Sequence, residues 1–204
     1  ASYRRQRQMC IRDSINIWEL RKKISTVNTD IRKRIKPDLK VLDLIIGGLY
    51  GKYCKIEYLS KLDILLAKNH MQNMKLSHLS QKYFGHLSEG EKQIILISRA
   101  LIANPEILIL DEPIANLDLK SKFYVIDKVN ELSKINTTIL CTTHDITSIT
   151  EIYSRIIMMK DRTIIYDGTQ KEVMTTKNIN KLFDINIKIT GHKGNWNIQR
   201  KLNN

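Results

Sequence analysis

The sequence predicts an α/β fold: a mostly parallel sheet with helices on both faces, together with a small helical subdomain. Short apolar runs of strand length, such as Ile107 to Leu110, alternate with helix-length segments in residues 87–168. These runs are continuously apolar, which is typical of parallel strands buried on both faces. Residues 30–86 have helical spacing and contain no convincing strand, which indicates the helical subdomain. Residues 169–204 follow as a C-terminal extension.

The elements are predicted from apolar spacing and from stop signals. Asn104 and Pro105 end the helix that starts after Leu87, because the residue before a proline disfavours helical backbone. The turn KDRT between two apolar runs predicts a hairpin. In chain order we expect a short helix before a strand at 24–27, helices within 39–51 and 57–74, a helix at 88–103, a strand at 107–110, a helix at 120–133, a strand at 138–142, a short helix at 146–153, and strands at 155–159 and 163–166.

Composition is ordinary for a globular domain, but the charge is uneven. The net charge is +13, and residues 1–40 hold 12 Lys/Arg against 4 Asp/Glu, a net +8. A basic arm on nucleic acid or on an anionic membrane is one interpretation. The other is a coding bias, since the chain is rich in Ile, Lys and Asn and no aromatic residues alternate with the charges for base stacking. The three scattered cysteines indicate free thiols in a reducing compartment.

Residues 1–14 are set apart from the rest of the chain. This basic, polar stretch has no apolar periodicity, and it resembles a translated sequencing adapter. We interpret it as non-native sequence, with a disordered basic arm as the alternative, and we expect the folded part to occupy residues 15–204.

Two adjacent carboxylates, Asp111 and Glu112, end the predicted strand in ILILDEP. Ligands of open α/β sheets bind beyond the carboxyl ends of the strands. Neighbouring strand residues point to opposite sides, so one acid can support a Mg²⁺ ion while the other orients a water that attacks a phosphate. A strand that merely runs into a polar turn is the structural alternative.

The stretch LSEGEKQ lies at the start of the helix predicted at 88–103. Ser88 and Glu91 have the spacing of a capping box, which by itself needs no function. Gly90 in the first turn leaves backbone N–H groups able to meet a phosphate. His144 follows the predicted strand 138–142, also on the ligand side of the sheet, although a lone histidine is more often a structural hydrogen-bonding residue.

In their order, these stretches resemble the motifs of ATP-binding cassette (ABC) ATPases. Leu87 to Glu91 match the signature loop, Ile107 to Glu112 the Walker B strand, Asn116 to Asp118 the D-loop, and His144 the switch histidine. The resemblance covers residues 87–145. It implies a P-loop NTPase-like fold, ATPase activity, and ATP and Mg²⁺ as cofactors.

The resemblance also implies catalytic roles. Asp111 would support Mg²⁺ through water, Glu112 would polarise the attacking water, and His144 would contact the γ-phosphate. These roles belong to a site that holds ATP within one subunit.

Further roles face a second subunit. Ser88 and Gly90 would contact the γ-phosphate of ATP held by the partner, and Asp118 would couple the two sites. The family's usual LSGGQ is varied here by Glu89 and Glu91, which lie in the same nucleotide-binding loop.

One departure concerns coupling to a transport partner. After the strand at 24–27 the family usually has a glutamine that contacts Mg²⁺ and the permease, whereas this sequence has Asn28 and Thr29. The stretches WELRKKI and VLDLIIGGLYG are similar to cassette proteins of the iron or molybdate transport subgroup.

The phosphate-binding motif GxxxxGK[ST] is not found in these 204 residues. The segment Ile46 to Tyr53 comes closest, but Ile46 stands where the first glycine is required and Tyr53 where a Ser or Thr is required. We therefore expect an incomplete chain that lacks the first strand–loop–helix unit and by itself binds ATP poorly.

The expected function is the ATP-binding and ATP-hydrolysing subunit of an ABC transporter. As the resemblance implies, such subunits form homodimers or heterodimers around MgATP and drive a separate transmembrane permease, at the inner face of the cell membrane and without specific nucleic acid. The alternative is a soluble ABC-type ATPase without a permease, associated with ribosomes or DNA, which the missing glutamine and the positive charge favour. A non-enzymatic regulatory remnant is the third hypothesis.

Overall fold

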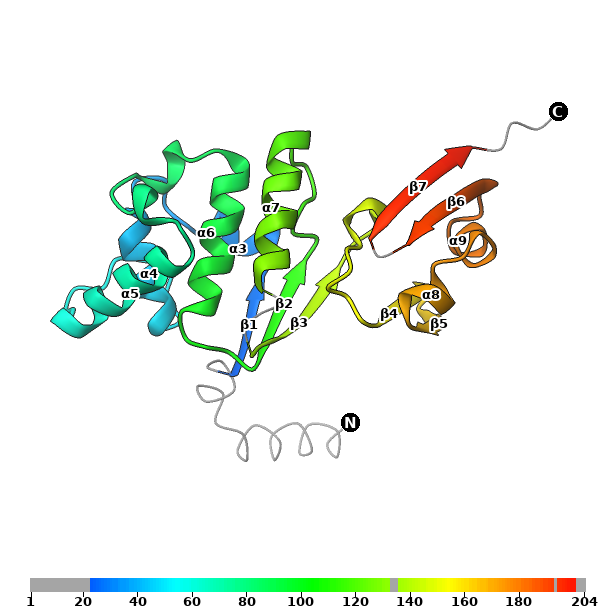
Figure 1. Cartoon of the computed structure of the whole chain (residues 1–204). Coiled ribbons are helices and arrows are strands. Elements are labelled where there is room, and N and C mark those ends of the chain that lie inside the picture. Colours follow the sequence, from blue (N-terminus) through cyan, green and yellow to red (C-terminus); the bar gives the residue numbers. More distant parts are fainter. Residues whose placement is uncertain (1–22, 133–135, 193, 201–204) are drawn as a thin grey trace, which may run out of the picture. The chain divides into compact units, whose positions relative to one another are not determined.

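The computed structural model describes residues 23–132, 136–192 and 194–200 (Figure 1). The chain divides into two compact units, the first formed by Ala1–Lys128 and Lys134–Thr142 and the second by Val129–Ser133 and Thr143–Asn204. The helix predicted before residue 24 lies outside the described residues. The predicted segments 30–86, 87–168 and 169–204 have other boundaries than these units, and that subdivision stays a prediction.

The first unit contains a parallel sheet of three strands, β1 (Ile24–Val27), β2 (Ile107–Asp111) and β3 (Thr138–Thr142), in the order β1-β2-β3. All three strands lie where the apolar runs predicted them. In the β2–β3 register Asp111 lies beside Thr142, so both strands end at the same edge of the sheet. The predicted α/β fold class is confirmed.

The two faces of this sheet differ in burial. Val27, Leu108 and Leu110 share one face and are buried. Ile109 and Leu140 lie on the opposite face, where Leu140 is 51% exposed. Among the described residues this second face is the less covered one, so helical cover of it stays a prediction.

The helices of this part of the chain start and stop largely as the apolar spacing predicts. The helix predicted at 88–103 runs from Glu89 to Leu101, with Ser88 as its N-cap. The elements are α3 (Thr29–Lys33), α4 (Val41–Leu49), α5 (Lys61–Asn73), α6 (Glu89–Leu101) and α7 (Leu119–Glu131), with short 3₁₀ turns at Ser77–Leu79 and Phe84–His86.

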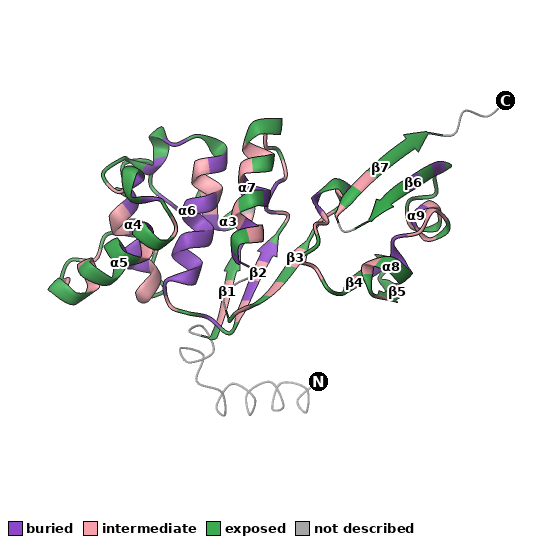
Figure 2. Cartoon of the chain, viewed as in Figure 1, coloured by how far each residue is buried: buried purple, intermediate pink, exposed green. Residues whose placement is uncertain are grey.

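Helix α6 forms the centre of the first unit. It is buried over most of its length (Figure 2) and contacts both α4 and β1. A Cβ built on Gly48 of α4 would lie 2.4 Å from the carbonyl oxygen of Arg99 on α6, so the two backbones approach closely. Helix α5 joins α6 through the ring Nε2 of His70, which donates to the carbonyl oxygen of Ser98 at 2.8 Å.

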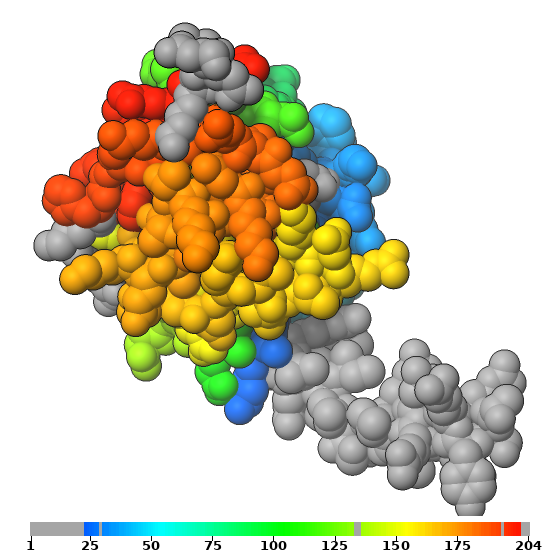
Figure 3. Space-filling model, turned by 90° about the vertical axis from the view of Figure 1, so that its right-hand side faces the viewer, coloured from blue at the N-terminus to red at the C-terminus, as the bar shows by residue number. Residues whose placement is uncertain are grey.

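The second unit consists of two antiparallel hairpins and short helices (Figure 1), packed around an apolar core. The predicted hairpin at 155–166 is present as β4 (Ile156–Lys160) and β5 (Thr163–Gly168). The space-filling view in Figure 3 looks onto this unit, whose yellow-to-red residues form a continuous surface. Its other elements are a 3₁₀ turn η4 (Ile146–Ser148), α8 (Gln170–Val173), α9 (Thr176–Phe183), β6 (Ile187–His192) and β7 (Asn195–Arg200).

The short helix predicted at 146–153 is wrong beyond its first turn. Only Ile146–Ser148 is helical, and Ile149 already has extended backbone. In a helix over 146–153 the Ile149 carbonyl oxygen would accept from the Tyr153 N–H, but a side chain donates to it instead, and two further carbonyl groups of the segment also accept from side chains. Trp196 donates to the oxygen of Ile149 at 3.1 Å, and the Gln170 amide donates to the carbonyl oxygens of Thr150 and Tyr153 at 2.6 and 2.8 Å. Tertiary hydrogen bonds thus replace the helical ladder here.

No helix among the described residues is both long enough and apolar enough to cross a membrane.

Candidate functional site

Asp111 and Glu112 lie at the carboxyl end of β2, as predicted. Asp111 is the last residue of the strand and is exposed, while Glu112 is half-buried and has a φ of 48°. That left-handed backbone is uncommon for a residue other than glycine, and it turns the chain sharply after the strand. The two carboxylates therefore belong to different local geometries, one on the strand and one on the turn.

The structure adds Thr142, the last residue of β3, to which no sequence motif points. Its Oγ1 donates to Oδ1 of Asp111 at 2.5 Å, and the Glu112 N–H donates to the Thr142 carbonyl oxygen at 3.1 Å. The only signal in the sequence is that each of the two strands ends in a polar residue, Asp111 in β2 and Thr142 in β3. Recognising the pair requires the strand register, which the sequence alone does not supply.

The donor chemistry of this edge fits Mg²⁺ held together with a phosphate ligand. No group of three or more His, Cys, Asp or Glu residues in the described part of the chain could hold a metal ion alone. Magnesium is often held by one or two carboxylates, with substrate phosphates and waters completing its shell. Asp111 presents one exposed carboxylate of that kind.

Ser88 and Glu91 form the predicted capping box at the start of α6. The Ser88 Oγ accepts from the Glu91 N–H at 3.2 Å, and Glu91 Oε2 accepts from the Ser88 N–H at 2.7 Å. Partial burial acts to raise the pKa of Glu91, but the Ser88 N–H and the Lys82 ammonium, 3.7 Å away, outweigh it and the pKa is lowered. The carboxylate is therefore engaged in holding the helix start.

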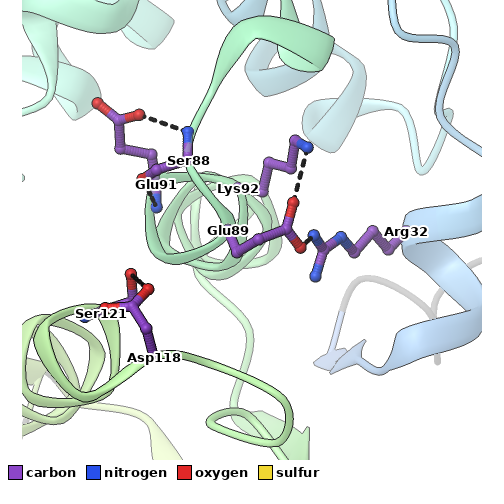
Figure 4. A network of polar contacts seen from close by, with 7 residues as sticks. All are labelled: Arg32, Ser88, Glu89, Glu91, Lys92, Asp118 and Ser121. Carbon is purple, nitrogen blue, oxygen red and sulfur yellow. Dashed lines mark hydrogen bonds and ion pairs between the residues drawn. The ribbon is translucent and has the colours of Figure 1, made fainter.

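The start of α6, with Ser88, lies near the start of α7, with Asp118 and Ser121 (Figure 4), and Gly90 is the residue of α6 that approaches Ser121. A Cβ on Gly90 would lie 2.9 Å from Cβ of Ser121, so only glycine allows this approach. Ser121 donates through its Oγ to Oδ2 of Asp118 at 2.6 Å and through its N–H to Oδ1 at 3.0 Å. The Ser121 hydroxyl, with that N–H, lowers the pKa of Asp118. The predicted signature and D-loop residues thus meet within one chain, through Ser121, which the sequence analysis did not name.

Glu89 links the start of α6 to α3. It forms ion pairs with Arg32 and with Lys92, the latter at 2.8 Å, as Figure 4 shows. Burial lowers the pKa of Arg32, although its guanidinium stays charged. Both carboxylates that distinguish this loop from LSGGQ therefore have basic partners, Arg32 and Lys92 for Glu89 and Lys82 for Glu91.

His144 belongs to the second unit and is exposed. The loop around it is ordered by Asp145, whose N–H donates to Oγ1 of Thr143 at 3.0 Å and whose Oδ1 accepts from the Thr147 N–H at 2.9 Å. The assignment of His144 to a γ-phosphate stays a prediction.

The two departures from the family pattern have local structural roles. Asn28, at the position of the usual glutamine, caps α3 by accepting from the Ile31 N–H at 2.9 Å. The segment Ile46 to Tyr53 contains the end of α4, where Gly48 permits the close contact with α6. The residues directly before it belong to α4 and not to a strand, as a phosphate loop would require.

Comparisons with known proteins point in one direction. The family model described as "ABC transporter" matches residues 5–115, just over half of the chain. An uncharacterized ABC transporter ATP-binding protein of Haemophilus influenzae is 30% identical over 79% of this chain, which spans 62% of that relative's length.

Solved structures agree. A putative metal-chelate type ABC transporter has the same fold, with a TM-score of 0.72 at 24% identity, over 87% of this chain and 70% of its own. A second structure, cbiO1 of Clostridium perfringens, described as part of the ABC transporter complex cbiONQ, is 27% identical with a TM-score of 0.66, over 80% of this chain and 63% of its own.

Proposed function

The chain belongs to the ABC transporter family, and from that premise we propose that the protein is the ATP-binding and ATP-hydrolysing subunit of a transporter. The observation that carries the proposal is the approach of the signature-helix start to the D-loop residue Asp118 through Ser121, in a unit whose central strand ends in Asp111 and is followed by Glu112. Relatives that match the chain bear the same family name.

Asp111 and Glu112 supply the chemistry at the sheet edge. When bound, Mg²⁺ would offset the charge of the phosphates, and Asp111 would hold it through water. Glu112 would accept a proton from the attacking water and orient it toward the phosphate. His144 would contact the γ-phosphate. The left-handed turn at Glu112 supports separate tasks for the two acids.

The start of α6 supplies the surface for a second protomer. Ser88 and Gly90, flanked by Glu89 and Glu91, would face ATP held by the partner subunit, where helix N–H groups and the helix dipole favour an anion. Asp118, fixed by Ser121, would couple the two sites. Two such subunits, alike or different, would close around MgATP.

The partner outside the dimer would be a transmembrane permease in a separate chain, which places the subunit on the inner face of the cell membrane. The chain's relative cbiO1 is described as part of a transporter complex, which supports this arrangement. Two charge pairs, Glu89 with Arg32 and Lys23 with Glu106, show that some of the basic residues near the N-terminus serve local contacts. This weakens the soluble, nucleic-acid-associated alternative.

The experiment is the substitution Glu112→Gln in the protein as its gene encodes it. Removing a general base lowers turnover by about 10²–10⁴-fold, so we expect phosphate release to fall by at least about a hundredfold while ATP stays bound. Light scattering of the variant with MgATP should then report a dimer.

Glu106→Gln is the matched control, because Glu106 precedes the same strand at its opposite end. It should keep wild-type turnover. Wild-type turnover in Glu112→Gln would remove Glu112 from the proposed role.

A further inference from the structure

Thr142 occupies a special position at the carboxyl edge of the sheet. It is the last residue of β3 and lies beside Asp111, the last residue of β2. Parallel strands in register place paired residues on the same face, and the Thr142 Oγ1 donates to Asp111 Oδ1 at 2.5 Å. Hydrogen bonds to a carboxylate are short and strong compared with those between neutral groups.

Thr142 also holds the residue that follows Asp111. The Glu112 N–H lies 3.2 Å from the Thr142 Oγ1 and 3.1 Å from its carbonyl oxygen. A hydroxyl has one proton to donate and two lone pairs that accept. The single Oγ1 can therefore donate to the Asp111 carboxylate and accept from the Glu112 backbone at the same time.

The backbone at Glu112 needs such support. Its φ of 48° lies in the left-handed region, which costs a residue with a Cβ free energy unless the surroundings hold it. A side chain that hydrogen-bonds both to the Asp111 carboxylate and to the Glu112 N–H holds the strand end and the turn in place together.

We propose that Thr142 is a positioning residue for magnesium-dependent nucleotide binding: its hydroxyl orients the Asp111 carboxylate and the turn at Glu112 toward the metal and phosphate. This inference rests on the proposed ATP site and deepens it. Thr142 binds one oxygen of Asp111, so the carboxylate is held in a single orientation before nucleotide arrives. It acts through Asp111 and Glu112 and not by contact with the nucleotide.

The test compares Thr142→Val, which keeps the branched shape and removes the hydroxyl, with Thr142→Ser, which keeps the hydroxyl. Titration calorimetry of the protein as its gene encodes it measures the ATP dissociation constant with Mg²⁺ and with EDTA. The ratio of the two constants is the gain in affinity due to the metal. Thr138→Val is the matched control, since Thr138 is an exposed threonine at the other end of β3.

We expect Thr142→Val to reduce the gain in ATP affinity due to the metal about tenfold, which is the usual contribution of a hydrogen bond to a charged group. Its affinity in EDTA and its unfolding midpoint without nucleotide should stay close to those of the wild type. Thr142→Ser should retain the gain to within about threefold, and Thr138→Val should match the wild type.

Two results would overturn the inference. If Thr142→Val keeps the full gain from Mg²⁺, or if it loses affinity equally with Mg²⁺ and with EDTA, Thr142 has only a structural role, and the proposed function still stands. If the wild-type protein shows neither nucleotide binding nor turnover, the proposed function itself fails, and the inference fails with it.

Discussion

Gly90 belongs to the proposed nucleotide-binding loop and also packs directly against helix α7. A Cβ there would lie 2.9 Å from Cβ and 3.1 Å from Oγ of Ser121, and Ser121 in turn fixes Asp118. The glycine lies inside the first turn of α6, where helix propensity alone would favour alanine. The absence of a side chain at this position is therefore explained by the neighbouring helix.

We expect Gly90→Ala to lower the free energy of unfolding by about 1–3 kcal/mol, the usual cost of overpacking. Urea denaturation measures the change. Ser121→Gly removes the opposing Cβ, so adding Gly90→Ala to Ser121→Gly should cost much less than adding it to the wild type. A Gly90→Ala protein as stable as the wild type would contradict the close approach of the two helices.

At the scale of elements, two helices of the first unit begin with the same serine capping box. Ser60 and Asp63 cap α5, and Ser88 and Glu91 cap α6, each with reciprocal side-chain and backbone hydrogen bonds. The proposed function gives only the second helix start a nucleotide to contact. Comparing the two caps therefore distinguishes the stabilising role of a serine N-cap from the nucleotide contact proposed for Ser88.

Ser60→Ala and Ser88→Ala should each destabilise the protein by about 1 kcal/mol, the usual worth of an N-cap. Thermal unfolding without nucleotide checks this part. Only Ser88→Ala should also reduce ATP turnover of the dimer, since its hydroxyl is proposed to face the partner's nucleotide. Equal turnover in the two variants would mean that Ser88 is a cap alone.

Elements with strong local signals could be predicted from the sequence. The three strands of the parallel sheet, α6 and the hairpin β4–β5 lie within a few residues of their expected positions, because apolar periodicity and a stop signal act locally. The region 146–153 could not, because three of its carbonyl groups accept hydrogen bonds from Gln170 and Trp196, far along the chain. The extension 169–204 contains α8, α9 and a second hairpin that were not predicted.

The same distinction applies to the candidate site. Ser88, Glu91, Asp111 and Glu112 can be proposed from the sequence, because their spacing or their place after a strand carries the signal. Their partners could not be identified in this way, because each comes from another element and is chosen by register or packing. Those partners are Thr142 for Asp111, Ser121 for Gly90 and Asp118, and Arg32 for Glu89.

At the scale of the whole molecule, each unit contains a carboxylate whose contribution to the free energy of unfolding changes with pH in the same direction. Hydrogen bonds from Ser121 lower the pKa of Asp118, and the Arg155 guanidinium lowers that of Asp167. A carboxylate whose folded pKa is lowered stabilises the protein above its unfolded pKa, of about 4. That stability is lost as the pH falls through the folded pKa, so these two carboxylates change the stability of the protein with pH only below about pH 4.

His70 should make the molecule sensitive to much milder acid. Its ring lies between α5 and α6, and burial lowers its pKa, with the hydrogen bond to Ser98 opposing only part of the effect. Above the unfolded pKa of about 6.5, both states are neutral and stability does not change. Below it the unfolded chain takes up the proton first, so stability falls as the pH drops through the lowered folded pKa. We expect the free energy of unfolding in urea to decline as the pH falls below about 6.5 in the wild type and in His78→Gln, an exposed control. In His70→Gln the decline should be much smaller, whatever its stability at pH 7, and an unchanged slope in that variant would show that His70 is not the group responsible.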